Sequence, residues 1–186
     1  MVFSGCSFEN ALLEKTSFIE VRFESCDFSN RNFSDSLFRS CEFIDSKGIG
    51  ANFADSRMIQ VSLKNCNLDL ANFTAVKFDT CTIARGSFKD AFFCGCTLKD
   101  LQLSKVSFIG TDFSQTPLKG VDFSACEFSS IHVSPSALEL KGVVVDLIQA
   151  AELSRMLGVI NKECRCIKNP SYFSPEGIAT WVCLLC

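Results

Sequence analysis

The chain is poor in the residues from which active sites are usually built. It has one His, one Trp and one Tyr among 186 residues. No paired carboxylates mark a cleft, no phosphate loop is present and no Ser, His and Asp pattern occurs, so nothing in the sequence would activate a nucleophile. The lone His132 lies at a flanking position of the chain's repeating pattern and is expected at the surface. We therefore predict that the protein is not an enzyme and has no cofactor.

Long apolar runs and an excess of positive charge are also missing. No stretch of 18 apolar residues occurs, which argues against a membrane span. The 18 Lys and Arg residues are outnumbered by 21 Asp and Glu, for a formal net charge of -3. Because phosphate recognition normally needs a surface rich in Lys and Arg, we expect no direct binding of nucleic acid.

Phenylalanine, by contrast, is abundant and recurs with a period of five. Every fifth residue from position 3 to position 143 gives 29 positions, of which 28 are apolar and 17 are Phe; the exception is Gly48. This period fits neither an α-helix, which repeats every 3.6 residues, nor a strand, which repeats every two. The chain must therefore turn once in every five residues.

The residues around each central position support the same interpretation. Two positions earlier the side chain is mostly small or compact, and the flanking positions are polar. A short edge and a corner in each unit would let backbone groups pair between stacked coils while the central side chains point to the axis. The pattern predicts an all-β solenoid, and its cysteine spacings fit coils of three or of four such units equally well.

Individual units resemble the pentapeptide-repeat family. Ala51-Asn52-Phe53-Ala54-Asp55 and Cys26-Asp27-Phe28-Ser29-Asn30 match its small, polar, central Leu or Phe, and variable positions. The resemblance extends over residues 1–145. It implies a right-handed quadrilateral β-helix of about seven coils.

The cysteines fall into two groups. The first group occupies the small inward position, where a compact free thiol suits a core. Stacked coils keep these side chains parallel, which suits disulfides poorly, so we expect a reducing, cytoplasmic setting. This group comprises Cys6, Cys26, Cys41, Cys66, Cys81, Cys96 and Cys126.

The second group, Cys164, Cys166, Cys183 and Cys186, lies in the atypical segment 161–186. Its spacing has plausible zinc stoichiometry, but we favour an extension without metal and assign no metal site.

Residues 146–160 carry the pattern of a short α-helix after the repeats. Asp146 can cap its beginning, and Gly158 can end it. Such a helix could cover the last layer of the core, or it could join two chains end to end in a two-fold dimer.

Several segments of this ending resemble Qnr quinolone-resistance proteins, and 41–53 resembles the region of their first loop. The segments are Leu140-Lys141-Gly142-Val143, Gln149-Ala150, Leu153 and Leu157-Gly158-Val159. The resemblance implies a rod-shaped homodimer that binds DNA gyrase and topoisomerase IV and protects them from quinolones. The five-residue register runs from Asn52 to Val143 without a second-loop insertion, as in the loop-free MfpA-like arrangement. The interface residues that we expect are Leu147, Leu153, Met156 and Leu157.

Charge is unevenly distributed if each coil consists of four units. Two neighbouring faces then carry nine acidic and four basic residues, whereas the other two carry eight and ten. An acidic flank could imitate DNA phosphates at a basic groove. The alternative is an interaction scaffold with an unrelated partner, because fold does not determine function. The candidate contact residues are Glu9, Asp27, Asp35, Asp55, Asp69, Asp90, Asp112 and Glu127.

Overall fold

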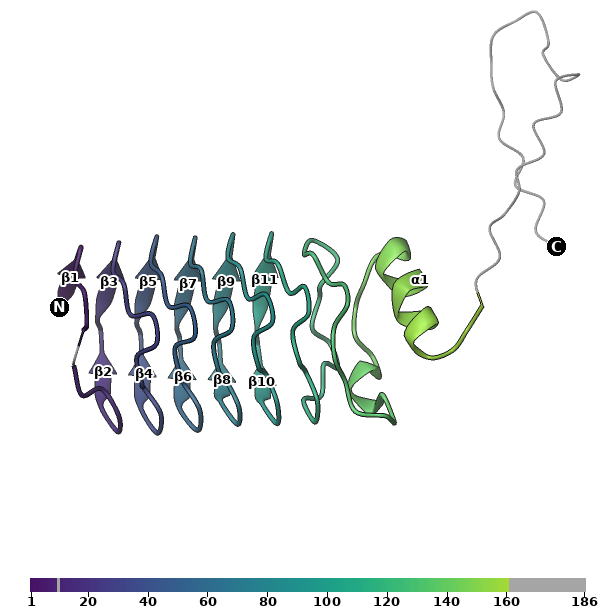
Figure 1. Ribbon diagram of the computed structural model, residues 1–186, viewed down its shortest axis with the longest axis horizontal. Helices are drawn as coiled ribbons and strands as arrows, with labels where there is room; N and C mark the ends of the chain where they lie inside the picture. Colours follow the sequence, from purple (N-terminus) through teal and green to yellow (C-terminus); the bar gives the residue numbers. More distant parts are fainter. Residues whose placement is uncertain (10, 161–186) are drawn as a thin grey trace, which may run out of the picture.

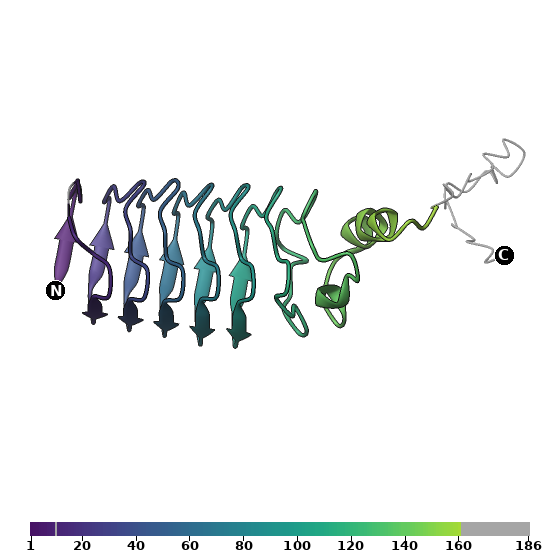
Figure 2. The ribbon, with the colours of Figure 1, turned by 60° about the horizontal axis from the view of Figure 1, so that its bottom comes forward.

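The computed structural model describes residues 1–9 and 11–160, which form a rod of stacked turns followed by a helix (Figure 1). Strands of three residues make two parallel sheets along the rod, with the orders β1-β3-β5-β7-β9-β11 and β2-β4-β6-β8-β10 (Figure 2). The strands are β1 (Val2–Ser4), β2 (Ser17–Ile19), β3 (Arg22–Glu24), β4 (Leu37–Arg39), β5 (Glu42–Ile44), β6 (Arg57–Ile59), β7 (Ser62–Lys64), β8 (Lys77–Asp79), β9 (Thr82–Ala84), β10 (Thr97–Lys99) and β11 (Gln102–Ser104).

Each coil consists of four five-residue units and has four sides. Every strand pairs with the strand at the same place in the next coil, so that Phe3 lies beside Phe23. Isolated bridges stack the two remaining sides with the same step, for example Asp27 with Lys47 and Asn32 with Asn52. A coil of three units is thus excluded, and the predicted four-sided parallel solenoid is confirmed.

The number of strand-bearing coils is smaller than predicted. The two sheets account for about five turns rather than seven, and beyond β11 the stacking continues only through isolated bridges such as that of Ser107 with Glu127. Proline explains the end of one sheet. In β10 the N–H of Thr97 donates to the carbonyl of Val76 in the previous coil. Pro117 takes the same position one coil later, and it cannot extend this ladder because it has no N–H.

The predicted central residues fill the axis of the rod. The twelve largest fully buried side chains are all Phe residues of the five-residue series. On one side the rings of Phe33, Phe53 and Phe73 stack with centroids 5.1 Å apart and planes within 6° of parallel. Rings from neighbouring sides meet edge to face, both being favoured arrangements of aromatic pairs. This continuous column of rings is the core of the molecule.

Gly48, the exception in the apolar series, does not interrupt the coil. Its N–H donates to the carbonyl of Asn67 at 2.8 Å, so the stacking continues through this unit. A Cβ at Gly48 would lie 2.2 Å from the ring of Phe28 and 2.8 Å from Leu68. These two side chains fill the space, and the region that resembled a loop in sequence contains regular coil, including β5.

The small inward residues connect adjacent coils. The thiol of Cys41 donates to the carbonyl of Phe18 at 3.3 Å, and the hydroxyl of Thr116 donates to the carbonyl of Phe93. Thr116 Oγ1 also accepts the N–H of Cys96 at 2.8 Å. All eight cysteines of the described residues are free thiols. Of the predicted inward group, five are buried and two, Cys6 and Cys126, are half-buried.

The predicted register fails in the last coil. Asp112 still pairs with His132, but Asp122 pairs with Val144, where the register predicts Gly142. Two additional residues therefore enter after His132, where the chain forms the short 3-10 helix η1 (Leu138–Leu140). As a result Leu138, expected in the core, is 72% exposed.

With the two-residue shift, Leu140 takes the core position predicted for Leu138 and packs against the core. The preceding Glu139 is only 6% exposed. Its Oε1 accepts the N–H of Gln115 at 2.8 Å. In earlier coils a backbone carbonyl accepts the equivalent N–H, as that of Thr74 does for Asp55. The carboxylate thus replaces a carbonyl that the lengthened coil no longer supplies.

The predicted C-terminal helix is confirmed as α1 (Leu147–Met156). Asp146 caps it in a reciprocal capping box with Gln149, and Gly158 adopts a φ of 79° just beyond its end. The helix docks on the last coil through Leu153, which is 7% exposed and part of the core. Within the described residues no helix has the length and apolar character needed to cross a bilayer.

Candidate interaction surfaces

The acidic candidates lie on the two neighbouring sides of the rod that lack sheets. We call this the acidic side; it consists of residues 6–9, 11–15, 26–35, 46–55, 66–75, 86–95, 106–115 and 126–135. The bridges through Asp27 and through Asp112 run along it. It carries nine acidic residues against four basic ones, and all eight candidate residues are among the nine.

Three of the candidate carboxylates are held by hydrogen bonds. The N–H of Ser29 donates to Asp27 at 2.9 Å and lowers the pKa of that carboxyl. Partial burial raises the pKa of Asp112, but hydrogen bonds from Ser114 outweigh it, so the net pKa is lowered. Asp69 accepts the hydroxyl of Ser87 at 2.5 Å. These carboxylates are oriented by the coil.

The other five candidates point into solvent. Glu9, Asp35, Asp55, Asp90 and Glu127 are exposed and form no side-chain hydrogen bond within the described part of the chain. Asp35, Asp55 and Asp90 occupy corners with positive φ, between 53° and 59°. Their negative charge is available to a partner.

Ion pairs occur on the sheets and not on the acidic side. Among residues 1–9 and 11–160 there are two: Arg22 with Glu42 at 2.7 Å and Lys99 with Asp79 at 3.0 Å. Each joins neighbouring strands of one sheet. No carboxylate of the acidic side forms an ion pair with a Lys or Arg side chain of the described residues, although the charge of Lys47 helps to lower the pKa of Asp27.

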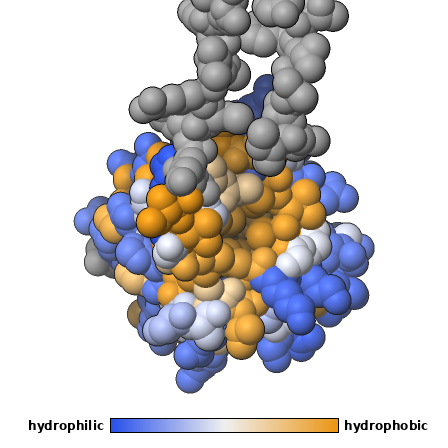
Figure 3. Space-filling view, turned by 90° about the vertical axis from the view of Figure 1, so that its right-hand side faces the viewer, coloured by the Kyte–Doolittle hydropathy of each residue, from blue (hydrophilic) through white to orange (hydrophobic). Residues whose placement is uncertain are grey.

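The C-terminal end of the rod is strongly apolar (Figure 3). Of the predicted interface residues, Leu147 is 90% exposed, Leu157 58% and Met156 45%. Leu153 is buried within the chain, so it anchors the helix and is not available to a second copy. Ile148, which the sequence analysis did not select, is 74% exposed and lines a hollow of about 630 Å³ with Val145 and Leu147.

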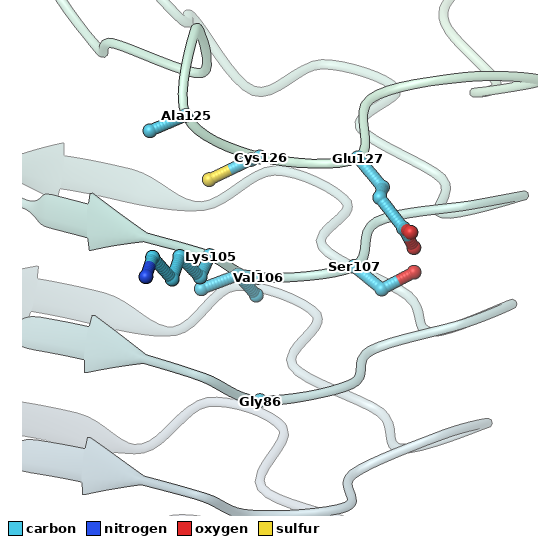
Figure 4. A pocket seen from close by; sticks show the side chains of 7 residues that line it. All are labelled: Gly86, Lys105, Val106, Ser107, Ala125, Cys126 and Glu127. Carbon is cyan, nitrogen blue, oxygen red and sulfur yellow. The ribbon is translucent and has the colours of Figure 1, made fainter.

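A cavity of about 410 Å³ lies on the wall beside Gly86, Lys105 and Cys126. In Figure 4 the side chains of Lys105 and Ser107 extend in opposite directions from the same stretch of chain. Burial raises the pKa of the Cys126 thiol, which keeps it protonated. Among the residues that line this cavity, neither the Cys126 thiol nor the Ser107 hydroxyl is hydrogen-bonded to a base.

The weak metal candidates Cys164, Cys166, Cys183 and Cys186 lie outside the described residues. Within the described residues no group of three or more His, Cys, Asp or Glu side chains could hold a metal ion.

Comparison with solved structures identifies other solenoids. QnrB1, a plasmid-mediated fluoroquinolone resistance protein, is 20% identical over 87% of this chain and 97% of its own, with a TM-score of 0.32. HetL, a pentapeptide repeat protein involved in heterocyst differentiation regulation in Nostoc, is 11% identical over 79% of this chain and 85% of its own, with a TM-score of 0.37. Rfr23 from the cyanobacterium Cyanothece is 12% identical over 70% and 64%, with a TM-score of 0.34.

Sequence comparison gives the family directly. No curated protein matches the chain significantly. The model of the pentapeptide repeat region matches residues 1–73 and 16–93, and the model of pentapeptide repeats in eight copies matches residues 87–124. Together with the four-sided coil of five-residue units, these matches place the chain in the pentapeptide-repeat family.

Proposed function

We propose that this protein is a non-catalytic DNA mimic that binds the DNA-gripping surface of type II topoisomerases, DNA gyrase and topoisomerase IV, and protects them from quinolones. The observation that carries the proposal is the acidic side, with nine acidic and four basic residues on two neighbouring faces of a straight rod. The sequence resemblance to Qnr proteins supports the choice of partner.

The dimensions of the rod suit this role. The bridges from Ser7 to Glu127 connect seven levels, two of which lie outside the five turns that bear both sheets. At about 4.8 Å per level they span roughly 30 Å, close to the length of one turn of DNA. Duplex DNA presents a regular array of negative charge that basic protein grooves recognise. Since the pKa values of Asp27 and Asp112 are lowered, both carboxylates are ionised at neutral pH. A partner that grips DNA would meet a rigid row of negative charge.

We further propose that two chains meet end to end through the apolar C-terminal surface in a cytoplasmic homodimer. Leu147, Met156 and Leu157 are exposed there and would be covered by a second copy. The free cysteines of the coils fit a reducing compartment.

Supercoiling by purified gyrase, titrated with the protein in the presence and absence of a quinolone, tests the main proposal. The wild type should alter supercoiling and reduce quinolone-induced DNA cleavage. The triple variant Asp35→Asn, Asp55→Asn and Asp90→Asn should lose at least tenfold in potency, because it removes three unpaired charges while Asn tolerates the corner conformation. Absence of any binding or effect by the wild type would leave an interaction scaffold with another partner.

A control of equal charge change separates local from overall electrostatics. Glu20→Gln, Glu24→Gln and Asp100→Asn remove three negative charges outside the acidic side. This variant should retain wild-type potency. Equal losses in both triple variants would show that total charge alone matters.

The dimer is tested with Met156→Glu and Leu157→Glu, both at exposed positions of the helix end. The sedimentation mass should fall from two chains to one. A wild-type mass that already corresponds to one chain, or an unchanged mass in the double variant, would contradict the end-to-end interface.

A further inference from the structure

Two large apolar side chains stand on the wall of the rod, away from both ends. Leu70 is 54% exposed and Phe92 46% exposed. Between residues 20 and 137 they are the exposed large hydrophobic residues of the described chain; the others lie in the first coil or from Leu138 onward. Isolated exposed apolar residues are common and need no explanation. These two, however, are neighbours on the acidic side.

Backbone hydrogen bonds establish that proximity. Phe92 donates its N–H to the carbonyl of Ala71 at 2.9 Å, and Leu70 donates to the carbonyl of Lys89 at 2.8 Å. Leu70 is thus next in sequence to Ala71, whose carbonyl accepts the N–H of Phe92 from the adjacent coil. The pair spans the corner between the two faces of the acidic side, halfway along the rod.

In four other coils, the residue at the position of Phe92 has a side chain that accepts a backbone hydrogen bond from its own coil. Along the same column Asn32, Asn52, Asn72 and Asp112 each accept the N–H of the residue two positions later, at 2.8–3.1 Å. A phenyl ring cannot accept this bond, and it leaves apolar surface in water. Local stability therefore does not explain Phe92.

Leu70 is likewise a residue type that local backbone stability does not favour at its position. It is a corner residue with a φ of 61°, and the other corners with positive φ carry polar, charged or small residues. Leu has no side-chain group to stabilise this left-handed conformation, whereas Asn does.

Carboxylates surround the pair. Asp69 precedes Leu70, Asp90 is the corner residue of the next coil, and Asp112 pairs with Phe92 in the coil after that. Asp69 and Asp112 are held by hydrogen bonds. An aromatic face and an aliphatic side chain near three carboxylates, two of which are held by hydrogen bonds, suit a planar guanidinium, which can stack on the ring and donate to the acids.

We infer that Leu70 and Phe92 form an apolar anchor for an arginine side chain on a basic protein partner, so that recognition depends on arginine stacking as well as on net charge. The inference deepens the proposed binding of a DNA-gripping surface and rests on it for the partner. The anchor would distinguish an arginine-bearing groove from a merely lysine-rich one. Such aromatic contacts at the centre of an interface commonly dominate affinity.

Fluorescence anisotropy with labelled deca-arginine and deca-lysine peptides tests the anchor without any topoisomerase. The wild type should bind deca-arginine up to about five times more tightly than deca-lysine, because only the planar guanidinium stacks on the ring while it donates a fork of hydrogen bonds to carboxylates. Phe92→Asn and Leu70→Asn should each reduce the ratio toward one. The matched change Ile19→Asn, at an exposed apolar residue outside the acidic side, should leave it unchanged. Equal wild-type affinities for the two peptides would overturn the inference.

Thermal unfolding provides the second measurement. Phe92→Asn and Leu70→Asn should unfold at the wild-type temperature or above, since Asn suits both positions. A lower midpoint would show that the two side chains serve the fold, and the anchor would be rejected. With gyrase itself, Phe92→Asn should weaken binding about fivefold. If the wild type prefers arginine but ignores gyrase, the proposed function fails and the anchor stands.

Discussion

At the scale of single residues, most polar side chains at the small inward position do more than avoid a clash, whereas Ala51 and Val61 only fill the space. Cys, Ser and Thr recur there because a thiol or hydroxyl can donate to a carbonyl of the previous coil, as Cys41, Cys66 and Ser36 do. Ser and Thr can also accept a backbone N–H, which Thr116 does for Cys96. Composition alone suggests that small size decides which residues occupy this position. The structure shows that the ability to form hydrogen bonds between coils also favours Cys, Ser and Thr there.

Thr116→Val tests this second role, because it keeps the shape and removes the hydroxyl. The buried N–H of Cys96 and carbonyl of Phe93 would lose their contacts with Oγ1. We expect a loss of about 1–3 kcal/mol in the free energy of unfolding, measured by urea denaturation. Thr74→Val is the control, since the hydroxyl of Thr74 forms no hydrogen bond in the described chain; it should change stability by less than about 0.5 kcal/mol. Equal effects of the two changes would contradict the role.

At the scale of elements, the last coil and α1 depend on polar contacts that periodicity does not reveal. Gln149 donates from Nε2 to the carbonyls of Phe123 at 3.0 Å and Cys126 at 2.7 Å, and its Oε1 accepts the N–H of Asp146. One side chain therefore both caps the helix and attaches it to the final turn.

Gln149→Leu should detach the helix from the rod while leaving the earlier coils intact. The carbonyl of Cys126 would lose its donor, and that of Phe123 would keep only the N–H of Cys126. We expect a cost of about 1–3 kcal/mol. Hydrogen exchange of residues 147–156 should accelerate at least tenfold, whereas exchange in β3 to β9 should remain at the wild-type rate. Gln102→Leu, at an exposed strand position, is the control. Unchanged exchange in α1 would show that Leu153 alone holds the helix.

The sequence predicted the regular part of the fold because one slot, filled mainly by Phe, repeats with little interruption. It failed where a local feature changed the spacing or the pairing. Pro117 ends a ladder of backbone hydrogen bonds between coils, because it has no N–H to donate to a carbonyl of the previous coil. This effect can be predicted only once the coil is known to consist of four units. The two additional residues after His132 left an apolar Leu138 in the predicted core position, so the pattern gave no warning that Leu140 would take this position and that Glu139 would be buried beside it. Leu153 was similarly assigned to the dimer interface, because the helix pattern does not show whether an apolar residue faces its own rod or a second chain.

At the scale of the whole molecule, charge and core are separated. The acids of the acidic side extend outward from a wall whose interior is apolar, and the two ion pairs of the described chain lie on the sheets. Stability therefore does not require neutralisation of the acidic side. Apart from Glu139, the buried titratable groups of the described chain are thiols, and they link stability to alkaline pH.

Burial raises the pKa of the Cys66 thiol, and it raises that of Cys96 to about 12. A thiol with a raised pKa contributes stability that is fully present below its unfolded pKa and is lost as pH rises toward the folded value. The free energy of unfolding should thus fall as pH increases from about 9 to 11, by up to roughly 1.4 kcal/mol per pH unit for each buried thiol.

Urea denaturation under reducing conditions measures this slope. The variant Cys66→Ser with Cys96→Ser should have a shallower slope, since Ser fits the same position at Ser46 and does not ionise, while all other titrating groups are unchanged. Identical slopes in the two proteins would mean that thiol burial does not govern the alkaline stability of the rod.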